Sequence, residues 1–392
     1  MDCGRFINKT VRDLKPSGIR KFFDIVAQMP DALSLGVGEP DFVTPWEIRD
    51  AAIKSVQKGY TAYTSNRGLL ALREETAAFL KERYGVKYDP AEEILITIGA
   101  SEAIDLTLRA VIEPGDGVIV PEPSYVSYMP AVALAGGVSQ SIKTTADDGF
   151  KLTAEAVEKA VTKNTKAIIL PYPNNPTGAV MTGRELEAVA PVIKKHDLLV
   201  LSDEIYAELS YGAPHTSIAS LKDMRERTAL LSGFSKAFAM TGWRVGYVAA
   251  PRELLSAMVK VHQYTIMCAP TVSQYAALAA LQTGRRSEFA AVAEMREKYD
   301  MRRRFMFKAF NDMGLKCFEP NGAFYVFPSV ESTGMDGEEF ARKLLEQKKV
   351  AVVPGGAFGE STKNFIRCSY ASGMPTLSEA VDRIADFIGA TS

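Results

Sequence analysis

The chain has 392 residues, of which 47% are hydrophobic and 24% are charged, the composition of an ordinary globular protein. Two domains are expected at this length, because one hydrophobic core seldom supports so many residues. The 46 Lys and Arg residues nearly balance the 47 Asp and Glu residues, which argues against a basic surface that binds nucleic acid. We therefore expect a small-molecule partner.

The cysteines and the distribution of apolar residues indicate the cellular setting. The four cysteines, at positions 3, 268, 317 and 368, include no CxxC pair, so their spacing predicts neither a disulfide framework nor a zinc site. The opening sequence MDCGRFINKTVRDL has no apolar run of the kind found in secretory signals. No stretch approaches the roughly 18 uninterrupted apolar residues of a membrane span. We expect a soluble, cytoplasmic protein that does not bind membranes.

The middle of the chain alternates short apolar runs with helical patterns. The apolar runs are 117–120 (GVIV), 167–170 (AIIL), 198–201 (LLVL) and 245–249 (VGYVA). They do not alternate between polar and apolar positions, which is typical of strands buried on both faces in a parallel sheet. Helical candidates before, between and after these runs are 101–111, 183–196 and 254–281. This order predicts an α/β fold with a mainly parallel sheet flanked by helices.

The last part of the chain has a different pattern. A long charged helix is expected over 288–313, and a further helix near 337–347. Short strands are expected near 324–327, 350–353 and 365–369. These elements predict a second, smaller α+β domain. Because the segment before residue 46 is too short for a domain, we assign 46–288 to the large domain, and 1–45 and 289–392 to the small one.

Two glycine-containing segments lie in the first third of the chain. The first, LGVGEPDFVTP, includes Gly38; it lacks the third glycine of a dinucleotide fingerprint and precedes no βαβ unit, so we reject a nicotinamide site. The second runs from a strand through Gly99 and Ala100 to Ser101 at the start of a helix. Free amides at a helix N-terminus and a hydroxyl suit a phosphate, although many α/β turns look the same.

The next two motifs place side chains directly after predicted strands. Tyr125, in PEPSY, would either stack on a flat heterocycle or pack as an ordinary core residue. Asn175, in LPYPNNPTG, is held in a turn before Pro176, and such a fixed amide can orient a ligand. The peptide bond between Asn175 and Pro176 is a candidate for the cis form.

Asp203 ends a buried strand in the sequence LVLSDEIY. A buried carboxylate needs a positive partner, and a protonated pyridine nitrogen would provide one. Tyr206 could then donate a hydrogen bond to the phenolic oxygen of the same ring. The alternatives for Asp203 are a helix N-cap or, with Glu204, a metal site that lacks further ligands nearby.

Lys236 lies in SGFSKAFAMTGWRVGY, a stretch of apolar and small residues after a strand. Burial lowers the pKa of a lysine from about 10.4 and makes its amine a better nucleophile toward an aldehyde. A surface lysine is the alternative, but the nearby Arg244 suits a phosphorylated aldehyde. Arg367, alone in the apolar strand NFIRCS, needs an anion, which is either a substrate carboxylate or an internal salt-bridge partner.

Together these motifs resemble the class I/II aminotransferases of the pyridoxal-phosphate fold type I superfamily. PNNPTG, SDEIY and SK…GWRVGY occur in that order, and the similarity runs from LGVGEPDFVTP to NFIRCSY. The resemblance implies a seven-stranded sheet and the cofactor pyridoxal 5'-phosphate. It also implies ping-pong transfer of an amino group between an L-amino acid and a 2-oxo acid, with glutamate and 2-oxoglutarate as one pair.

The resemblance also implies a role for each residue. Lys236 would bind the cofactor covalently and move the proton at the substrate Cα, and Asp203 would pair with the pyridine nitrogen. Tyr206 and Asn175 would contact the phenolic oxygen, and Tyr125 would stack on the ring. Arg367 would bind the substrate α-carboxylate with Gly38 and Asn175 beside it. The phosphate would lie against Gly99, Ala100, Ser101, Ser235 and Arg244. Tyr63 would reach the phosphate of the neighbouring subunit, which implies a homodimer.

The sequence departs from the family pattern at Gly233, where many members have a serine that contacts the phosphate; Ser232 or Ser235 is the expected substitute. Ser101 stands where some members have a lysine for a distal carboxylate, so Arg20 and Lys21 are the alternative cations. Two other functions are compatible with parts of the pattern. A C–S lyase would use the same motifs, and a pyridoxal-phosphate-binding sensor of a transcription regulator would need a DNA-binding segment before the first motif.

Overall fold

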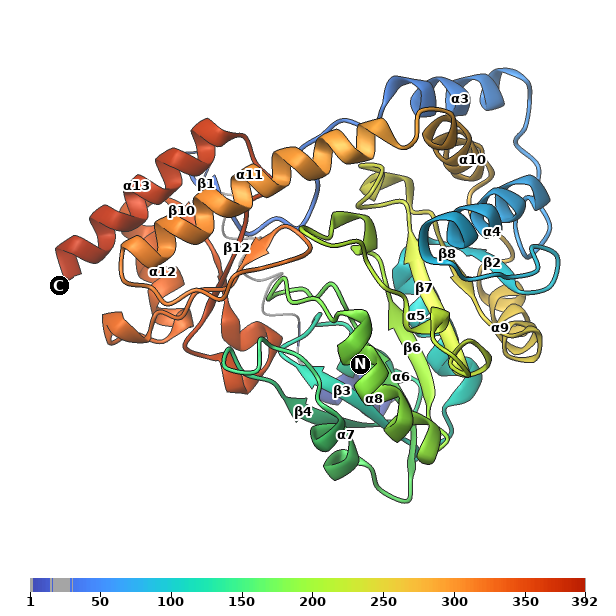
Figure 1. Ribbon diagram of the computed structural model, residues 1–392, viewed down its shortest axis with the longest axis horizontal. Coiled ribbons are helices and arrows are strands. Elements are labelled where there is room, and N and C mark those ends of the chain that lie inside the picture. Colours follow the sequence, from blue (N-terminus) through green and yellow to red (C-terminus); the bar gives the residue numbers. More distant parts are fainter. Residues whose placement is uncertain (1–2, 15, 17–28, 30, 392) are drawn as a thin grey trace.

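The computed structural model describes residues 3–14, 16, 29 and 31–391, and its centre is a seven-stranded sheet (Figure 1). The strands in spatial order are β2 (Ile94–Thr97), β8 (Gly246–Ala249), β7 (Thr228–Gly233), β6 (Leu199–Asp203), β5 (Thr165–Leu170), β3 (Gly117–Glu122) and β4 (Val138–Lys143). All neighbours pair in parallel except β8, which is antiparallel to both β2 and β7. The fold is the mainly parallel α/β fold predicted from the sequence.

Helices cover both faces of this sheet, because its central strands are apolar on both sides. One face packs against α5 (Gly99–Val111), α6 (Tyr128–Leu134) and α9 (Arg252–Thr265). The other face packs against α7 (Ala154–Ala160), α8 (Gly183–Lys195), α4 (Leu70–Tyr84) and α10 (Thr271–Arg286), with α3 (Trp46–Gln57) on α10. Successive side chains of β2 point to opposite faces of the sheet. Leu95 packs against the first layer of helices, whereas Ile94 and Ile96 pack against the second.

A second group of elements lies beside the sheet, at the left in Figure 1. Its helices are α11 (Ala290–Asp312), α12 (Gly337–Lys348) and α13 (Met374–Thr391). Its small sheets are β11 (Val353–Pro354)–β12 (Ile366–Ser369)–β9 (Tyr325–Val326) and the pair β1 (Leu33–Ser34)–β10 (Val350–Ala351). Pairing of β1 with β10 joins the N-terminal segment to this group, as expected, whereas the domain boundaries at 45/46 and 288/289 stay a prediction.

Two predicted elements differ in detail, and one strand was not predicted. The helix expected over 254–281 is two helices, because Pro270, the N-cap of α10, lacks the backbone donor that a continuous helix needs. The strand expected over 350–353 is divided, since β10 pairs with β1 and β11 with β12. The edge strand β4 was not predicted, because its sequence VSQSIK is largely exposed and contains no apolar run.

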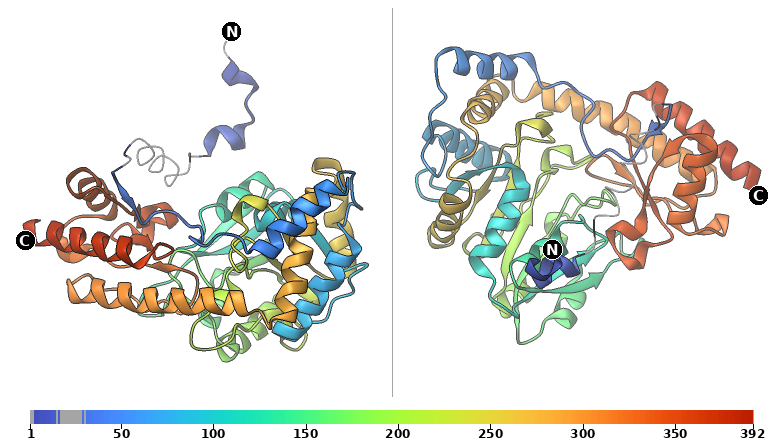
Figure 2. Two further views of the ribbon diagram at one scale, coloured as in Figure 1. Left: turned by 90° about the horizontal axis from the view of Figure 1, so that it is seen from above. Right: turned by 180° about the vertical axis from the view of Figure 1, so that it is seen from behind.

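The remaining elements are short. The first described ones, η1 (Cys3–Phe6) and α1 (Lys9–Asp13), project from one side of the molecule (Figure 2), where α1 contacts α6. Seven further 3-10 turns among the described residues are η2 (Ala207–Leu209), η3 (Ile218–Ser220), η4 (Arg225–Arg227), η5 (Thr241–Trp243), η6 (Glu331–Thr333), η7 (Gly355–Phe358) and the adjoining η8 (Glu360–Thr362). Among the described helices, none combines the length and the apolar character that a membrane span requires.

Candidate active site

The predicted site residues follow strands that end at one edge of the sheet. Because β2 is antiparallel to β8 and β8 to β7, β2 runs in the same direction as β3, β5, β6 and β7. Their carboxyl ends therefore meet, which is where open α/β sheets bind ligands. Asp203 is the last residue of β6, and Gly99, Tyr125, Asn175 and Lys236 follow the ends of the other strands.

A cleft of about 1310 Å³ opens at this edge, between the sheet and the C-terminal elements. Its lining includes most of the predicted site residues: Gly38, Ala100, Ser101, Tyr125, Asn175, Asp203, Tyr206, Ser235, Lys236, Arg244 and Arg367. Leu14 and Pro16 of the N-terminal segment also line it. The sequence thus identified the residues that tertiary folding assembles into one cavity.

Lys236 lies in the turn after β7 with its side chain largely out of solvent. Its Nζ donates a hydrogen bond to the carbonyl oxygen of Gly38 at 2.6 Å. Burial lowers its pKa to about 8, and the positive charges of Arg367 and Arg244 act in the same direction. A larger fraction of the amine is therefore uncharged near neutral pH than in an exposed lysine.

Asp203 is the buried anion of the cleft. Its Oδ2 accepts a hydrogen bond from the Tyr128 hydroxyl at 2.7 Å, and its Oδ1 accepts one from the Ile205 amide at 3.2 Å. Burial raises its pKa to about 6, while the Tyr128 hydrogen bond opposes that rise. At neutral pH the carboxylate is charged, and its two hydrogen-bond donors among the described residues are neutral. A cationic ligand atom would compensate it.

Arg244 lies at the N-terminus of α5, where two glycines allow a close approach. A Cβ on Gly99, whose φ is +69°, would lie 2.7 Å from Nη2 of Arg244. A Cβ on Gly246 would lie 2.6 Å from the backbone carbon of Gly99. Arg244 itself has a φ of +49°, a strained conformation for a non-glycine residue. The free amides of α5 and this guanidinium together suit a phosphate group.

Arg367 is a buried cation with neutral partners. It is 3% exposed, and its guanidinium donates to Oδ1 of Asn175 at 2.9 Å and to the carbonyl oxygen of Gly36 at 2.6 Å. Its partners among the described residues are these two neutral oxygens and no carboxylate, and its Nε has no hydrogen-bond partner there. The internal salt bridge considered from the sequence is therefore not observed among these residues, and the guanidinium remains available for a ligand carboxylate.

The structure explains the glycine at position 233. A Cβ there would lie 2.9 Å from Cα of Gly246, so a serine would push the two strands apart. Ser232 donates to the backbone oxygen of Glu204 at 3.2 Å, outside the cleft, whereas Ser235 lines the cleft. Of the two candidate substitutes, only Ser235 is placed to contact a ligand there.

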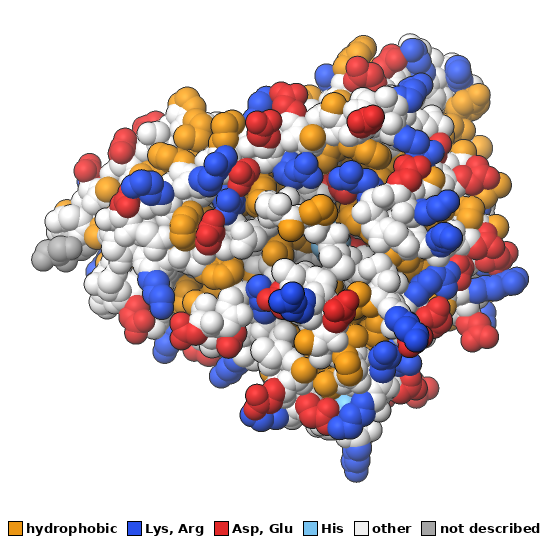
Figure 3. Space-filling view, viewed as in Figure 1, with side chains coloured by type: hydrophobic (Ala, Val, Ile, Leu, Met, Phe, Trp, Pro, Cys, Tyr) orange, Lys and Arg blue, Asp and Glu red, His pale blue; other side chains and the backbone are white. Residues whose placement is uncertain are grey.

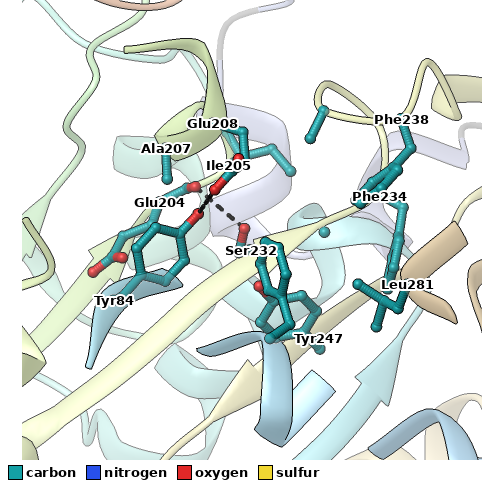
Figure 4. A pocket seen from close by; sticks show the side chains of 13 residues that line it. Tyr84, Glu204, Ile205, Ala207, Glu208, Ser232, Phe234, Phe238, Tyr247 and Leu281 are labelled. Atoms are coloured by element: carbon teal, nitrogen blue, oxygen red, sulfur yellow. Dashed lines mark hydrogen bonds between the residues drawn. The ribbon is translucent and has the colours of Figure 1, made fainter. Parts of the chain in front are cut away.

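A second, much smaller cavity of about 10 Å³ is lined by Tyr84, Glu204 and Ser232, among others (Figure 4). It has room for one water molecule at most, which excludes a substrate. Glu204 accepts hydrogen bonds from Ser202, Ser217 and His215 on this side. The metal alternative for Asp203 and Glu204 therefore has no support, and no group of metal-binding side chains occurs in the described part of the chain.

Of the predicted site residues that the structure describes, Gly99 and Tyr63 are not in the cleft lining. Tyr63 is 79% exposed and does not line the cleft of its own chain. Arg20 and Lys21 lie outside the described residues. Conversely, sequence reasoning missed Tyr128 and Tyr325, which contact Asp203 and Tyr206. Their only sequence signal was an aromatic residue near a strand, a feature shared with many core positions.

Comparison with known proteins identifies the family. The family described as "Aminotransferase class I and II" matches residues 30–384. The chain belongs to the class I and II aminotransferases. It is 51% identical to the Bacillus subtilis (strain 168) protein named "Putative aminotransferase YugH" over 99% of both chains. The aromatic aminotransferase from Pyrococcus horikoshii OT3 is 44% identical, with a TM-score of 0.89 over 94% of this chain and 99% of that one.

The aspartate aminotransferase from Thermus thermophilus is 37% identical, with a TM-score of 0.92 over 97% of this chain and 99% of that one. These similarities confirm the predicted family, the fold type I architecture and the aminotransferase activity. Members of this family use pyridoxal phosphate.

Positive and negative side chains are interspersed over the face shown in Figure 3, in keeping with the balanced composition.

Proposed function

We propose that the cleft binds pyridoxal 5'-phosphate and exchanges an amino group between an L-amino acid and a 2-oxo acid. When bound, this cofactor supplies an aldehyde that condenses with amines and a ring that accepts electrons. The observation that carries the proposal is the presence of Lys236, Asp203 and Arg244 in one cleft, with the charges that the aldehyde, pyridine nitrogen and phosphate require.

Each residue would act through its own chemistry. Lys236 would hold the cofactor through its amine and, once released as a free amine, move the proton at the substrate Cα. Asp203 would keep the pyridine nitrogen protonated through a buried charge pair. Tyr206 and Asn175 would contact the phenolic oxygen, and Tyr125 would stack on the ring face. The phosphate would bind at the start of α5 against Gly99, Ala100, Ser101, Ser235 and Arg244.

The substrate would be held by its α-carboxylate. Arg367, with Gly38 and Asn175 beside it, would bind the two carboxylate oxygens in a bidentate arrangement. We also propose glutamate and 2-oxoglutarate as one substrate pair, as the sequence resemblance implies. The relatives are named for aspartate and for aromatic amino acids, so the family accepts both acidic and aromatic side chains.

The first experiment is an absorbance spectrum of the purified protein with pyridoxal phosphate, followed by single amino acids without an acceptor. Transamination predicts a visible band that shifts to shorter wavelength with a donor and returns with a 2-oxo acid. A band that persists while pyruvate accumulates would indicate a C–S lyase instead. Turnover with other donors but none with glutamate would contradict the proposed pair.

We further propose a homodimer whose active sites share Tyr63. The support is a set of exposed apolar side chains on and near α3 and on the neighbouring α9–α10 connection. A monomeric protein rarely exposes so many apolar side chains together, and such a patch is typical of a protein–protein interface. They are Trp46, Ile53, Val56, Tyr60, Tyr63, Tyr264, Ile266 and Met267. Hydrogen bonds from Thr271 to the Ala62 carbonyl and from Asn66 to the Met267 carbonyl hold the two segments together.

Mixed dimers test whether Tyr63 acts across the interface. Lys236→Ala and Tyr63→Ala proteins are expected to be defective when each is assayed alone at limiting cofactor. If Tyr63 serves the partner's site, a mixed dimer has one intact site and one doubly defective site, so mixing restores activity. If Tyr63 serves its own chain, both sites of the mixed dimer stay defective. Absence of recovery in proven mixed dimers would therefore refute the sharing.

A further inference from the structure

Tyr325 of β9 contacts both Tyr206 and Arg367, two cleft residues that the sequence motifs place far apart. Its hydroxyl lies 2.9 Å from the hydroxyl of Tyr206, and the two side chains are 1% and 5% exposed. The guanidinium carbon of Arg367 lies 4.4 Å from the centre of the Tyr325 ring. One buried ring therefore contacts both the proposed ligand of the phenolic oxygen and the proposed ligand of the substrate carboxylate.

The position of this hydroxyl is fixed from a third side. A Cβ on Gly38 would lie 2.4 Å from the Tyr325 oxygen, so the hydroxyl lies directly against the Gly38 backbone. The Tyr325 ring also packs against Phe324, with centroids 4.8 Å apart. These contacts leave the hydroxyl little freedom to turn away from Tyr206.

The direction of this hydrogen bond follows from the role proposed for Tyr206. The two hydroxyl oxygens lie 2.9 Å apart, and either one could be the donor. Each phenol carries a single proton. If Tyr206 donates its proton to the phenolic oxygen of the cofactor, the proton between the two tyrosines must come from Tyr325, which then donates to the Tyr206 oxygen.

We propose that Tyr325 is a positioning residue of the aminotransferase: by donating its proton to Tyr206, it orients and strengthens the hydrogen bond that Tyr206 donates to the phenolic oxygen of the cofactor. The strengthening follows from the mutual polarisation of hydrogen bonds in a chain within a low-dielectric interior. The inference rests on the proposed placement of Tyr206 at that oxygen.

The consequence is measurable at the cofactor. A hydrogen bond donated by Tyr206 to the phenolic oxygen would stabilise negative charge on that oxygen, so it would lower the pKa of the cofactor held by Lys236. Removing the Tyr206 hydroxyl should raise this pKa by roughly one unit, the size expected for one buried hydrogen bond. Removing the Tyr325 hydroxyl should raise it by a smaller amount, because Tyr206 remains as a donor whose hydrogen bond is weaker by roughly 10–30%.

The experiment is a double-mutant cycle on the holoenzyme. The pKa of the Lys236-bound chromophore is measured by absorbance titration for the wild type, Tyr206→Phe, Tyr325→Phe and the double variant. Tyr325→Phe removes one oxygen and keeps the ring against Arg367, so the fold should be retained. Tyr370→Phe is the matched control, because it also removes a buried hydroxyl, which bonds to the Ala323 carbonyl outside the cleft.

A relay predicts that the double variant has the same chromophore pKa as Tyr206→Phe alone, and that Tyr370→Phe leaves it unchanged. No shift in Tyr325→Phe, or shifts that simply add in the double variant, would overturn the relay. No shift in Tyr206→Phe would also overturn it, by showing that Tyr206 does not contact the phenolic oxygen. The proposed function would survive these results, since its own failure is the absence of a transaminating chromophore in the wild type.

Discussion

Replacing Arg367 by methionine tests the proposed carboxylate site most directly. The side chain keeps its approximate length but loses the charge and the donors that would bind two carboxylate oxygens. Hydrogen bonds to charged groups contribute about 1.5–3 kcal/mol each, so two of them amount to about 3–6 kcal/mol. At 1.36 kcal/mol for each tenfold change, kcat/KM should fall by roughly 10²- to 10⁴-fold. Cofactor binding should be largely retained, because Arg367 is not assigned to it.

Two comparisons make this result specific. A simple amine without an α-carboxylate makes no use of Arg367. Its amination of the bound cofactor, followed by absorbance, should therefore be equally slow in the wild type and in Arg367→Met. Arg303→Met is the control for losing a buried arginine: Arg303 is 8% exposed, pairs with Asp300 and Glu319, and does not line the cleft. It should lower the free energy of unfolding but not kcat/KM of the folded enzyme. A loss below tenfold for Arg367→Met, or an equal loss with the amine, would refute the assignment.

Further predictions concern pH and backbone strain. Capture of pyridoxal phosphate by the apoprotein should accelerate as pH rises toward about 8 and then level off, because the free amine of Lys236 is the nucleophile. Stopped-flow absorbance measures this rate, and a pH-independent rate would contradict it. The affinity for the cofactor should fall as pH drops below about 6, where Asp203 takes up a proton and loses its charge; Asp203→Asn should bind weakly without this transition in an equilibrium titration. Gly178→Ala should lower the free energy of unfolding, measured in urea, by more than Gly212→Ala does. For Gly212→Ala the expected loss is about 1 kcal/mol, because the positive φ is the only cost there. An added Cβ lies 2.3 Å from the Pro320 Cβ at Gly178 but within 4 Å of nothing at Gly212, so equal losses would contradict the packing argument.

The sequence by itself determined the class of fold and most of the cleft. The buried strands could be predicted because apolar runs such as AIIL leave no polar face, which requires cover on both sides. Local chemistry also carried the expectations for Lys236, whose pKa is indeed lowered, and for the Asn175–Pro176 bond, which is cis. Pro270 was a local signal of a helix break, but it was not used when a single helix was expected over 254–281.

Only the tertiary structure decided which side chains meet. Tyr325 and Tyr206 are 119 residues apart in the chain, and Tyr128 and Asp203 are 75 apart, so no local pattern encodes either hydrogen bond. The glycine at position 233 became intelligible only when β8 was placed against β7. Periodicity and residue type report the burial and backbone preference of a segment, because these depend on near neighbours. The partner of a buried hydroxyl or guanidinium depends on packing between distant segments, which the folded chain alone specifies.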